Sequence, residues 1–338
     1  MTADTVDHFE VVLADGTITT ASKTQNSDIW TGLKGGGGQF AIVTDFVLQT
    51  FPIGNVWGGY KIFAMDQKDK VLTATHNLVS DYYDPKAAVI VTFTTTLNTL
   101  VDIFVVFFYY NDPNGPGEIL KEFDAIPSII DATKANRSYK DLIDSNSLFS
   151  LSGLRYLIRT GTFPNLAGDA GMDIYNYTFN SWYDLAKKYQ AQTPLDVPAF
   201  SLAFQPVPYT LQNASITAPN GVNNLGLDPK HGDKFFMEYD VSWLSPATDK
   251  AVAAYITNIT QPAQDYAKSK YSNSKPTHYQ SGDTSFTNFN PMFMNDAMYN
   301  QDPLRSYGSA TYNKLKAIQQ KRDPKGFFSK RTGGFKYT

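Results

Sequence analysis

The sequence predicts an α+β fold in which helices cover one face of a large antiparallel sheet. Residues 56–63 and 87–110 are long runs rich in β-branched and aromatic residues, which favour strands. Helical patterns lie near 66–82 and 115–124, between or after these runs. Runs of strands interspersed with helices are typical of sheet-and-helix layers. With 338 residues and 42% hydrophobic residues, the chain is long enough for two domains.

The first 52 residues form a separate pattern. Residues 8–20 alternate apolar and polar positions on both sides of Asp15-Gly16, so they predict a hairpin. A short helix over 27–33 follows, and four consecutive glycines come directly after it. Residues 40–52 then read as a strand that ends at a proline.

The rest of the chain continues the mixed pattern. We expect strands at 196–206 and 233–243. The segment 213–232, rich in Asn, Gly and Pro, predicts a loop, and 277–302 is irregular. Helices are expected at 175–192, at 246–267 and, as a basic amphipathic helix, at 306–321.

The composition excludes several functional classes. Lys plus Arg is 29 against 32 for Asp plus Glu, a net charge of −3 with no basic block, so neither nucleic acid nor an anionic membrane is expected as a partner. There is no cysteine, and the four histidines have no metal-ligand spacing, so we expect no metal site. No signal peptide is visible, and the localisation stays unassigned. A small hydrophobic molecule is the expected partner.

The glycine run Gly35–Gly38 has two interpretations. Four glycines between a helix and a strand cost backbone entropy, which favours a close approach of the backbone to a cofactor. A flexible connector explains the same run. The run precedes a strand and no Lys-Ser/Thr follows it, so it is neither a dinucleotide fingerprint nor a P-loop.

Two segments together resemble a known family. Residues 28–52, DIWTGLKGGGGQFAIVTDFVLQTFP, closely resemble the segment that ends the flavin-binding domain in the vanillyl-alcohol-oxidase, or PCMH-type, superfamily. Residues 291–338, with an Asn-aromatic stretch, a Tyr-Gly, a Lys-rich helix and an Asp-Pro, are similar to the C-terminal segment of berberine-bridge-enzyme-like oxidoreductases. The match is closest to the fungal branch that acts in secondary metabolism.

The resemblance implies an architecture and a cofactor. Residues 1–55 would be the last part of a PCMH-type FAD-binding domain, 56–285 an α+β substrate domain, and 286–338 a segment that returns to the FAD domain. FAD is the implied cofactor. We expect Gly35–Gly38 and the segment around Asn295 to lie against each other across a shared cleft. The residues implied to contact FAD are Gly37, Gly38, Ile42, Val43 and Asn295.

Departures from the family pattern set further expectations. Gln39 stands where Asn is usual and Ala41 where Gly is usual, and a methyl at Ala41 would crowd the cofactor if that backbone needed positive φ. The family's pyrophosphate-binding loop, with its flavin-linked histidine, has no counterpart in the sequence. We therefore expect an N-terminally truncated form with impaired FAD binding, in which any flavin is held noncovalently.

The resemblance also implies a catalytic base on the sheet of the substrate domain. No carboxylate occurs at 214–217, where some plant members have a Glu. The candidates that remain are Tyr239, Gln205 and His231, and a buried structural tyrosine is the alternative interpretation of Tyr239.

Two functions remain open on the sequence alone. The first is oxidation of a small hydrophobic secondary metabolite by hydride transfer to FAD, with O2 as acceptor. The second is a flavin-free protein on the same scaffold, either a cyclase of the pericyclase kind or a ligand-binding protein. For either function, apolar strand edges in residues 1–55 predict poor solubility or pairing with another chain.

Overall fold

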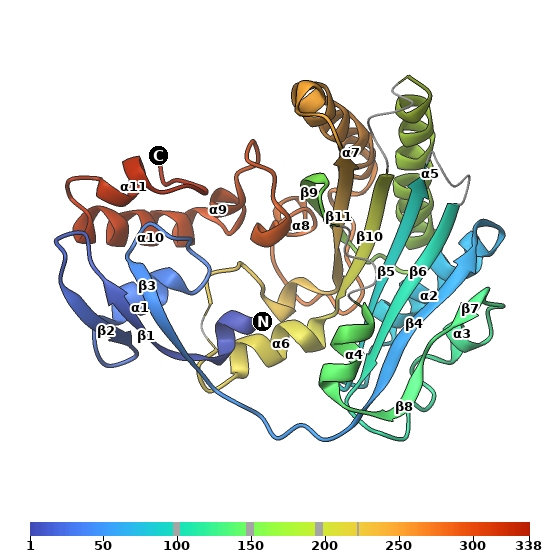
Figure 1. The fold of residues 1–338 in the computed structure, drawn as a ribbon, viewed down its shortest axis with the longest axis horizontal. Helices are drawn as coiled ribbons and strands as arrows, with labels where there is room; N and C mark the ends of the chain where they lie inside the picture. Colours follow the sequence, from blue (N-terminus) through green and yellow to red (C-terminus); the bar gives the residue numbers. More distant parts are fainter. Residues whose placement is uncertain (97–101, 147–151, 193–198, 222) are drawn as a thin grey trace. The chain divides into compact units, whose positions relative to one another are not determined.

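The chain divides into two units in a computed structural model that describes residues 1–96, 102–146, 152–192, 199–221 and 223–338 (Figure 1). Unit 1 contains residues 1–52, 211–229 and 290–338. Unit 2 contains residues 53–210 and 230–289. The boundaries expected after residues 55 and 285 fall after residues 52 and 289, and one further segment differs from the expected division. Residues 211–229, expected inside the substrate domain, belong to unit 1.

Unit 1 is built on a small antiparallel sheet. Its strands are β1 (Val6–Val12), β2 (Ile18–Ser22) and β3 (Ile42–Leu48), in the order β2-β1-β3. The expected hairpin is confirmed, because β1 and β2 pair directly. At its turn Gly16 has a φ of 87°, which glycine adopts readily, and the Thr17 N–H donates to Asp15 Oδ1 at 2.9 Å.

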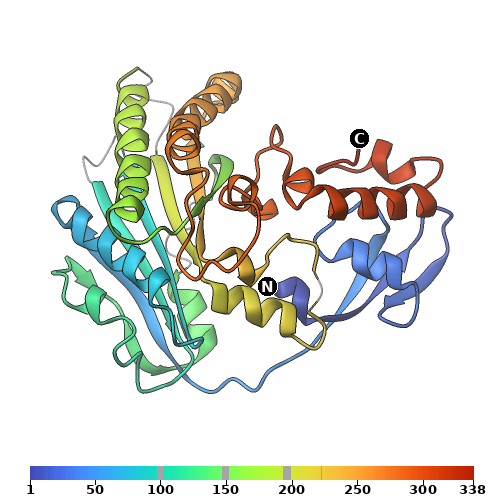
Figure 2. The ribbon, with the colours of Figure 1, turned by 180° about the vertical axis from the view of Figure 1, so that it is seen from behind.

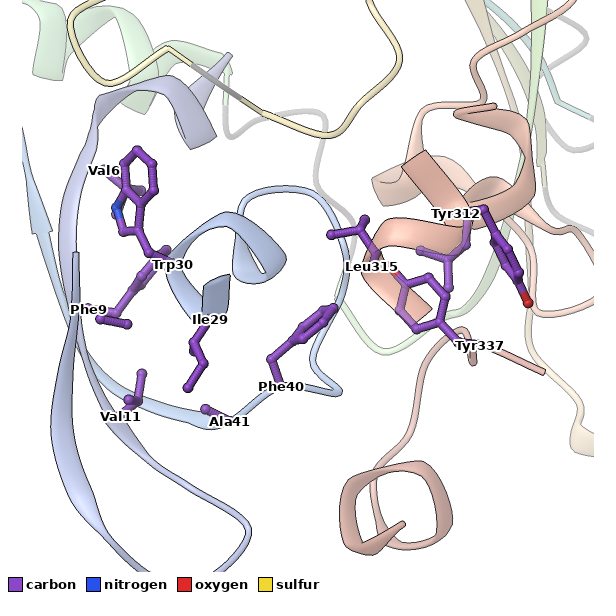
Figure 3. Close-up of a cluster of buried hydrophobic side chains, with 12 residues drawn as sticks. Val6, Phe9, Val11, Ile29, Trp30, Phe40, Ala41, Tyr312, Leu315 and Tyr337 are labelled. Atoms are coloured by element: carbon purple, nitrogen blue, oxygen red, sulfur yellow. The ribbon is translucent and has the colours of Figure 1, made fainter. Parts of the chain in front are cut away.

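Helices from both ends of the chain pack in unit 1. They are α1 (Ser27–Leu33), α9 (Pro303–Ser306), α10 (Ser309–Arg322) and α11 (Phe327–Arg331), with most of α6 (Tyr209–Thr217) and the short turns η1 (Thr2–Thr5) and η6 (Met294–Asp296). Figure 3 shows Phe40 directed toward Leu315 and Tyr337, so the N-terminal and C-terminal parts share one core. The members of this core are Val6, Phe9, Val11, Ala21, Ile29, Trp30, Phe40, Ala41, Leu304, Tyr312, Leu315 and Tyr337.

The edge strand β3 is largely exposed. Phe46 is 58% exposed and Leu48 is 44% exposed, although both are large apolar residues. β3 pairs with β1 along one edge, and the sheet order leaves its other edge unpaired within the sheet. An unpaired edge with exposed apolar side chains is a surface suited to pairing.

Unit 2 contains the large antiparallel sheet predicted from the sequence, and this prediction is confirmed. Its strand order is β7-β4-β6-β5-β10-β11-β9, with β8 also paired to β4. In chain order the strands are β4 (Val56–Ala64), β5 (Ala87–Thr96), β6 (Asp102–Tyr110), β7 (Ile130–Asp131), β8 (Lys134–Arg137), β9 (Arg155–Pro164), β10 (Ala199–Val207) and β11 (Lys234–Trp243).

Three long helices cover one face of this sheet (Figures 1 and 2). They are α2 (Lys68–Ser80), α5 (Gly168–Gln192) and α7 (Asp249–Tyr271). We call the face they cover the helix face and the opposite one the second face. Shorter elements complete unit 2: η2 (Met65–Gln67), α3 (Lys121–Asp124), α4 (Tyr139–Asn146), η5 (Pro246–Thr248) and α8 (Thr284–Thr287), with η4 (Pro229–His231) at a unit boundary.

Several boundaries differ from the expectations. The loop expected over 213–232 is wrong at its start, because α6 continues to Thr217. Its sequence, YTLQNASIT, has no apolar face, so periodicity does not reveal it. β9 and α4 were not predicted, and α5 starts at Gly168, earlier than expected. Within the described ranges, no helix has the length and apolar character needed to cross a bilayer.

Candidate functional site

The four glycines of the run Gly35–Gly38, in unit 1, have two kinds of surroundings. A Cβ at Gly36 would lie 2.4 Å from the carbonyl oxygen of Gly32, and one at Gly35 would lie 2.9 Å from Leu225 Cδ2. These two glycines are therefore required by packing. A Cβ at Gly37 or Gly38 would meet no atom within 4 Å. The backbone at Gly37 and Gly38 is therefore open to an approaching molecule.

Tyr337 and Phe335 of the C-terminal tail contact the glycine run and the adjoining Gln39, whereas the sequence analysis named the segment around Asn295 for this contact. Tyr337 donates its hydroxyl to the carbonyl oxygen of Gly36 at 2.9 Å. Gln39 is buried and donates its side-chain amide to the carbonyl oxygen of Phe335 at 2.9 Å. The expected cofactor residue Asn295 lies in η6, where its side chain is exposed.

A residue that the sequence analysis did not single out holds the end of α1. Asn224 donates its backbone N–H to the carbonyl oxygen of Lys34 at 2.9 Å. Its side-chain amide donates to the carbonyl oxygens of Thr31 and Lys34 at 2.5 and 3.1 Å. The last carbonyls of a helix have no partner within the helix, so Asn224 satisfies them and fixes the chain just before the glycines.

Lys34 is a buried cation beside this turn. Its side chain is 1% exposed, and Nζ lies 4.1 Å from the centre of the Trp30 ring. Nζ also donates to the carbonyl oxygen of Asn220. Burial lowers the pKa of Lys34 to about 8, and the nearby Asp4 opposes this shift. A charge at this position is tolerated because the ring face and the carbonyl replace part of its hydration.

Ile42 and Val43, which were expected to contact FAD, begin the strand after the glycines, and Ala41 directly precedes them. Ala41 is buried in the unit 1 core and is absent from the positive-φ residues of the described chain. The concern that its methyl group meets a strained backbone therefore does not apply. Ile42 is 50% exposed, whereas Val43 packs against the core of unit 1.

In unit 2, the structure places Tyr239 on the helix face. Tyr239 is opposite Leu202, which is opposite Phe93, and directly opposed residues share a sheet face. Phe93 packs on Phe179 of α5 with ring centres 4.9 Å apart. The Tyr239 hydroxyl is buried and has no hydrogen-bond partner among the described residues. Burial raises the pKa of Tyr239 well above its usual range, with Arg159 opposing, so this position does not suit a base that meets a substrate.

The other expected residue, Gln205, lies on the second face and has an acidic partner. Its side-chain amide donates to Glu238 Oε2 at 2.6 Å. Glu238 precedes Tyr239 on β11, and alternation along a strand directs the two side chains to opposite faces. The structure therefore separates Tyr239 from Gln205 and places Glu238 beside Gln205. Strict alternation over FFMEYDVSW is the signal that could have identified Glu238 from the sequence.

Polar side chains surround this pair on the second face. Glu238 lies opposite Ala203 on β10 and opposite Thr160 on β9. Two residues before Ala203 on β10, the Ser201 hydroxyl lies opposite Thr94 of β5, and the two hydroxyls share a hydrogen bond of 3.0 Å. A carboxylate with an amide and hydroxyls on one strand face can bind a hydroxylated group and take a proton from it.

The third expected candidate, His231, lies in η4, and a Cβ at Gly282 would be 2.7 Å from its ring. A second histidine, His278, interacts with a buried carboxylate of the same region. His278 Nδ1 lies 2.6 Å from the buried carboxylate of Asp233, which also accepts from the Thr277 hydroxyl at 2.7 Å. Within the described residues, no three His, Asp or Glu side chains are grouped so that they could hold a metal ion.

Known proteins resemble this chain both in sequence and in fold. The chain is 31% identical over 336 residues to an uncharacterised FAD-linked oxidoreductase of Arthroderma benhamiae, an alignment that covers 98% of the chain and 63% of that protein. The chain is homologous to FAD-linked oxidoreductases. It is also 30% identical to the FAD-dependent monooxygenase drtC of Aspergillus calidoustus and 25% identical to the bifunctional solanapyrone synthase of Alternaria solani, each over 99% of the chain. These homologues confirm the family resemblance seen in the sequence.

The chain spans about 60% of the length of these relatives: 63%, 60% and 59% of the three, respectively. No protein-family model matches the sequence.

Solved structures show the same fold. The chain matches 6-hydroxy-D-nicotine oxidase from Arthrobacter nicotinovorans with a TM-score of 0.65 at 14% identity, covering 96% of the chain and 65% of that structure. It matches a VAO-type flavoprotein from Myceliophthora thermophila with a TM-score of 0.66 at 16% identity, covering 96% and 56%. At these identities the likeness establishes the fold, so the predicted fold class is confirmed.

Proposed function

We propose that the chain is part of an FAD-dependent oxidoreductase that oxidises a small hydrophobic secondary metabolite, with O2 as the final acceptor. The relatives named as FAD-linked oxidoreductases support the flavin chemistry. The observation that carries the proposal is the open backbone at Gly37 and Gly38, next to two glycines that packing requires.

Unit 1 would hold the FAD. The backbone of Gly37 and Gly38 offers an unobstructed surface, and the half-exposed Ile42 begins the strand β3 that follows. The residues present therefore fit a planar cofactor that approaches closely to the chain. When bound, FAD supplies a two-electron acceptor that O2 reoxidises. The exposed side chain of Asn295 is a further candidate contact.

We propose noncovalent FAD. The sequence contains no cysteine for a cysteinyl link. His8 is the one histidine in the unit 1 segments, and its Nδ1 lies 2.8 Å from Asp7 on β1. Release of flavin into the supernatant on acid precipitation supports this arrangement, and flavin that stays in the pellet contradicts it.

Unit 2 would bind the substrate on its second face. Glu238 would accept a proton from the group that is oxidised, and Gln205 would hold the carboxylate in place through the 2.6 Å hydrogen bond. This assignment replaces Tyr239, which lies under α7 with its hydroxyl buried. The hydroxyls of Thr94 and Ser201 would orient the polar part of the substrate.

An oxidation screen tests the function. The protein is incubated with FAD, desalted and mixed without oxygen with a panel of hydrophobic primary and secondary alcohols. We expect bleaching of the flavin absorption by at least one alcohol class, and formation of hydrogen peroxide when oxygen is admitted. A protein that binds or cyclises such compounds without any flavin would instead support a flavin-free role.

A further inference from the structure

An apolar hollow lies between α4 and the second face of the unit 2 sheet. Its volume is about 270 Å³. A cavity of roughly 150 Å³ is enough to hold benzene, so this one has room for a larger ring system. Its lining is almost entirely aliphatic and aromatic, with Ile90, Phe107 and Tyr109 from the sheet, Tyr139 and Ile143 from α4, and one amide, Asn146.

Hydrogen bonds of Arg137 fix helix α4 against strand β4. Arg137 is buried and donates to the carbonyl oxygen of Gly58 on β4 at 3.1 Å. The same guanidinium donates to the Asp141 carboxylate and to its main-chain carbonyl, both at 2.7 Å. The Tyr139 ring meets the Tyr109 ring edge-on, with centres 5.9 Å apart. Helix α4 therefore forms a fixed wall of the hollow.

The floor of the hollow belongs to the same sheet face as the Gln205–Glu238 pair. Phe204 is opposite Val91, so the next residues, Gln205 and Ile90, are neighbours on the second face. Ile90 in turn is opposite Phe107. Two strand spacings of about 4.8 Å separate the strand of Ile90 from that of Glu238, a span of roughly 10 Å.

Large apolar side chains are exposed at this hollow. Ile90 is 43% exposed, Ile143 is 50% exposed and Tyr139 is 46% exposed. Burying such side chains against an apolar group contributes about 25 cal/mol for each Å² removed from water. An apolar ring system gains this energy here, whereas the lining offers no charged side chain to pair with an ionic group.

We propose that this hollow binds the ring end of the substrate, so that Ile90, Tyr139 and Ile143 select for aromatic or alicyclic compounds. The inference rests on the proposed function, because it places the ring about two strand spacings from Glu238, the residue that would accept the proton. The substrate class is therefore a ring system that carries its oxidisable group roughly 10 Å from its apolar end.

Binding of 2-naphthol, followed by its fluorescence, tests the proposal on the full chain without added flavin. We expect saturable binding that Ile143→Lys weakens about tenfold or more, since a lysine there covers the hollow with a cation. Ile129→Lys is the matched control. Ile129 is a 60% exposed isoleucine of unit 2 outside the hollow, and its replacement should leave binding unchanged.

Circular dichroism of each variant establishes that it folds, and Tyr139→Ala provides a second variant of the wall. Absence of saturable binding to the wild-type chain, or equal binding by both lysine variants, overturns the proposal. FAD binding is measured on the same preparations. A chain that binds 2-naphthol in the hollow but never binds FAD refutes the FAD site proposed for unit 1 and leaves the ring site standing.

Discussion

Gln205 donates a hydrogen bond of 2.6 Å to the carboxylate of Glu238, on the sheet face opposite the three long helices of unit 2. The neighbouring Tyr239 lies under those helices with a buried hydroxyl. Glu238 and Tyr239 are consecutive on β11, yet the side chain of Glu238 is accessible to a ligand and that of Tyr239 is buried in the core.

The first prediction concerns Glu238. Glu238→Gln keeps the shape of the side chain but removes its ability to accept a proton, so kcat should fall by about 10²–10⁴. The measurement is steady-state oxidation of whichever alcohol bleaches the flavin in the screen. Glu118→Gln, which changes an exposed glutamate of unit 2, should leave the rate unchanged. A Glu238→Gln enzyme with the wild-type rate would remove this residue from the chemistry.

The second prediction separates the roles of the glycines. Gly36→Ala should lower the free energy of unfolding by about 1–3 kcal/mol, because its methyl group would lie 2.4 Å from a main-chain oxygen. Gly38→Ala should change the free energy of unfolding by less than about 0.5 kcal/mol, since no atom lies within 4 Å of the added group. It should nevertheless weaken FAD binding. Urea unfolding and FAD titration together measure both effects, and equal stability losses in the two variants would contradict the assignment.

The third prediction follows from Lys34. Its pKa is lowered from 10.5 to about 8 by burial, so the unfolded chain binds more protons than the folded chain between these values. The Lys34 contribution to stability should therefore increase as pH rises from about 8 to 10.5, and below about pH 8 the full burial penalty remains. Lys34→Met should lose this pH dependence.

Urea unfolding at about pH 7 and about pH 10 measures the Lys34 effect as a difference between variant and wild type. The exposed Lys314→Met is the control. If the difference between Lys34→Met and wild type were the same at both pH values, Lys34 would not be the titrating group.

The fourth prediction concerns the exposed edge strand β3. We propose that its apolar side chains pair with another chain, because Phe46 is 58% and Val47 is 37% exposed on an edge strand. The double variant Phe46→Lys, Val47→Lys should therefore be more soluble and elute as a smaller species on size-exclusion chromatography with light scattering. Ile129→Lys should not change the elution. A wild-type chain that is monomeric at all concentrations would exclude the pairing.

Local signals in the sequence were sufficient for much of the fold. Asp15-Gly16 between alternating residues predicted the hairpin, because a turn of this kind depends on adjacent residues alone. β9 and α6 were missed for the opposite reason. Arg155–Pro164 becomes a strand by pairing with β11, a partner distant in sequence, and α6 has no apolar stripe.

The candidate site was only partly accessible from the sequence. Gly37 and Gly38 were identified by resemblance, but only coordinates distinguish them from the tightly packed Gly35 and Gly36. Tyr239 was selected as a candidate base for its chemistry, and its burial under α7 depends on which face of β11 the helices cover. The same face assignment reveals Glu238, which alternation along the strand predicts only once one face is known.

The central claim is that unit 1 offers its glycine backbone to FAD, and retention of the cofactor tests it most directly. The purified chain is incubated with excess FAD and desalted, and its visible absorption spectrum is recorded beside that of Gly38→Leu. Because FAD binding is expected to be impaired, we expect the wild-type chain to retain less than one FAD per chain, and Gly38→Leu, whose unfolding curve stays unchanged, to retain none. A wild-type chain that elutes colourless, or a Gly38→Leu chain that retains as much flavin, would contradict the account.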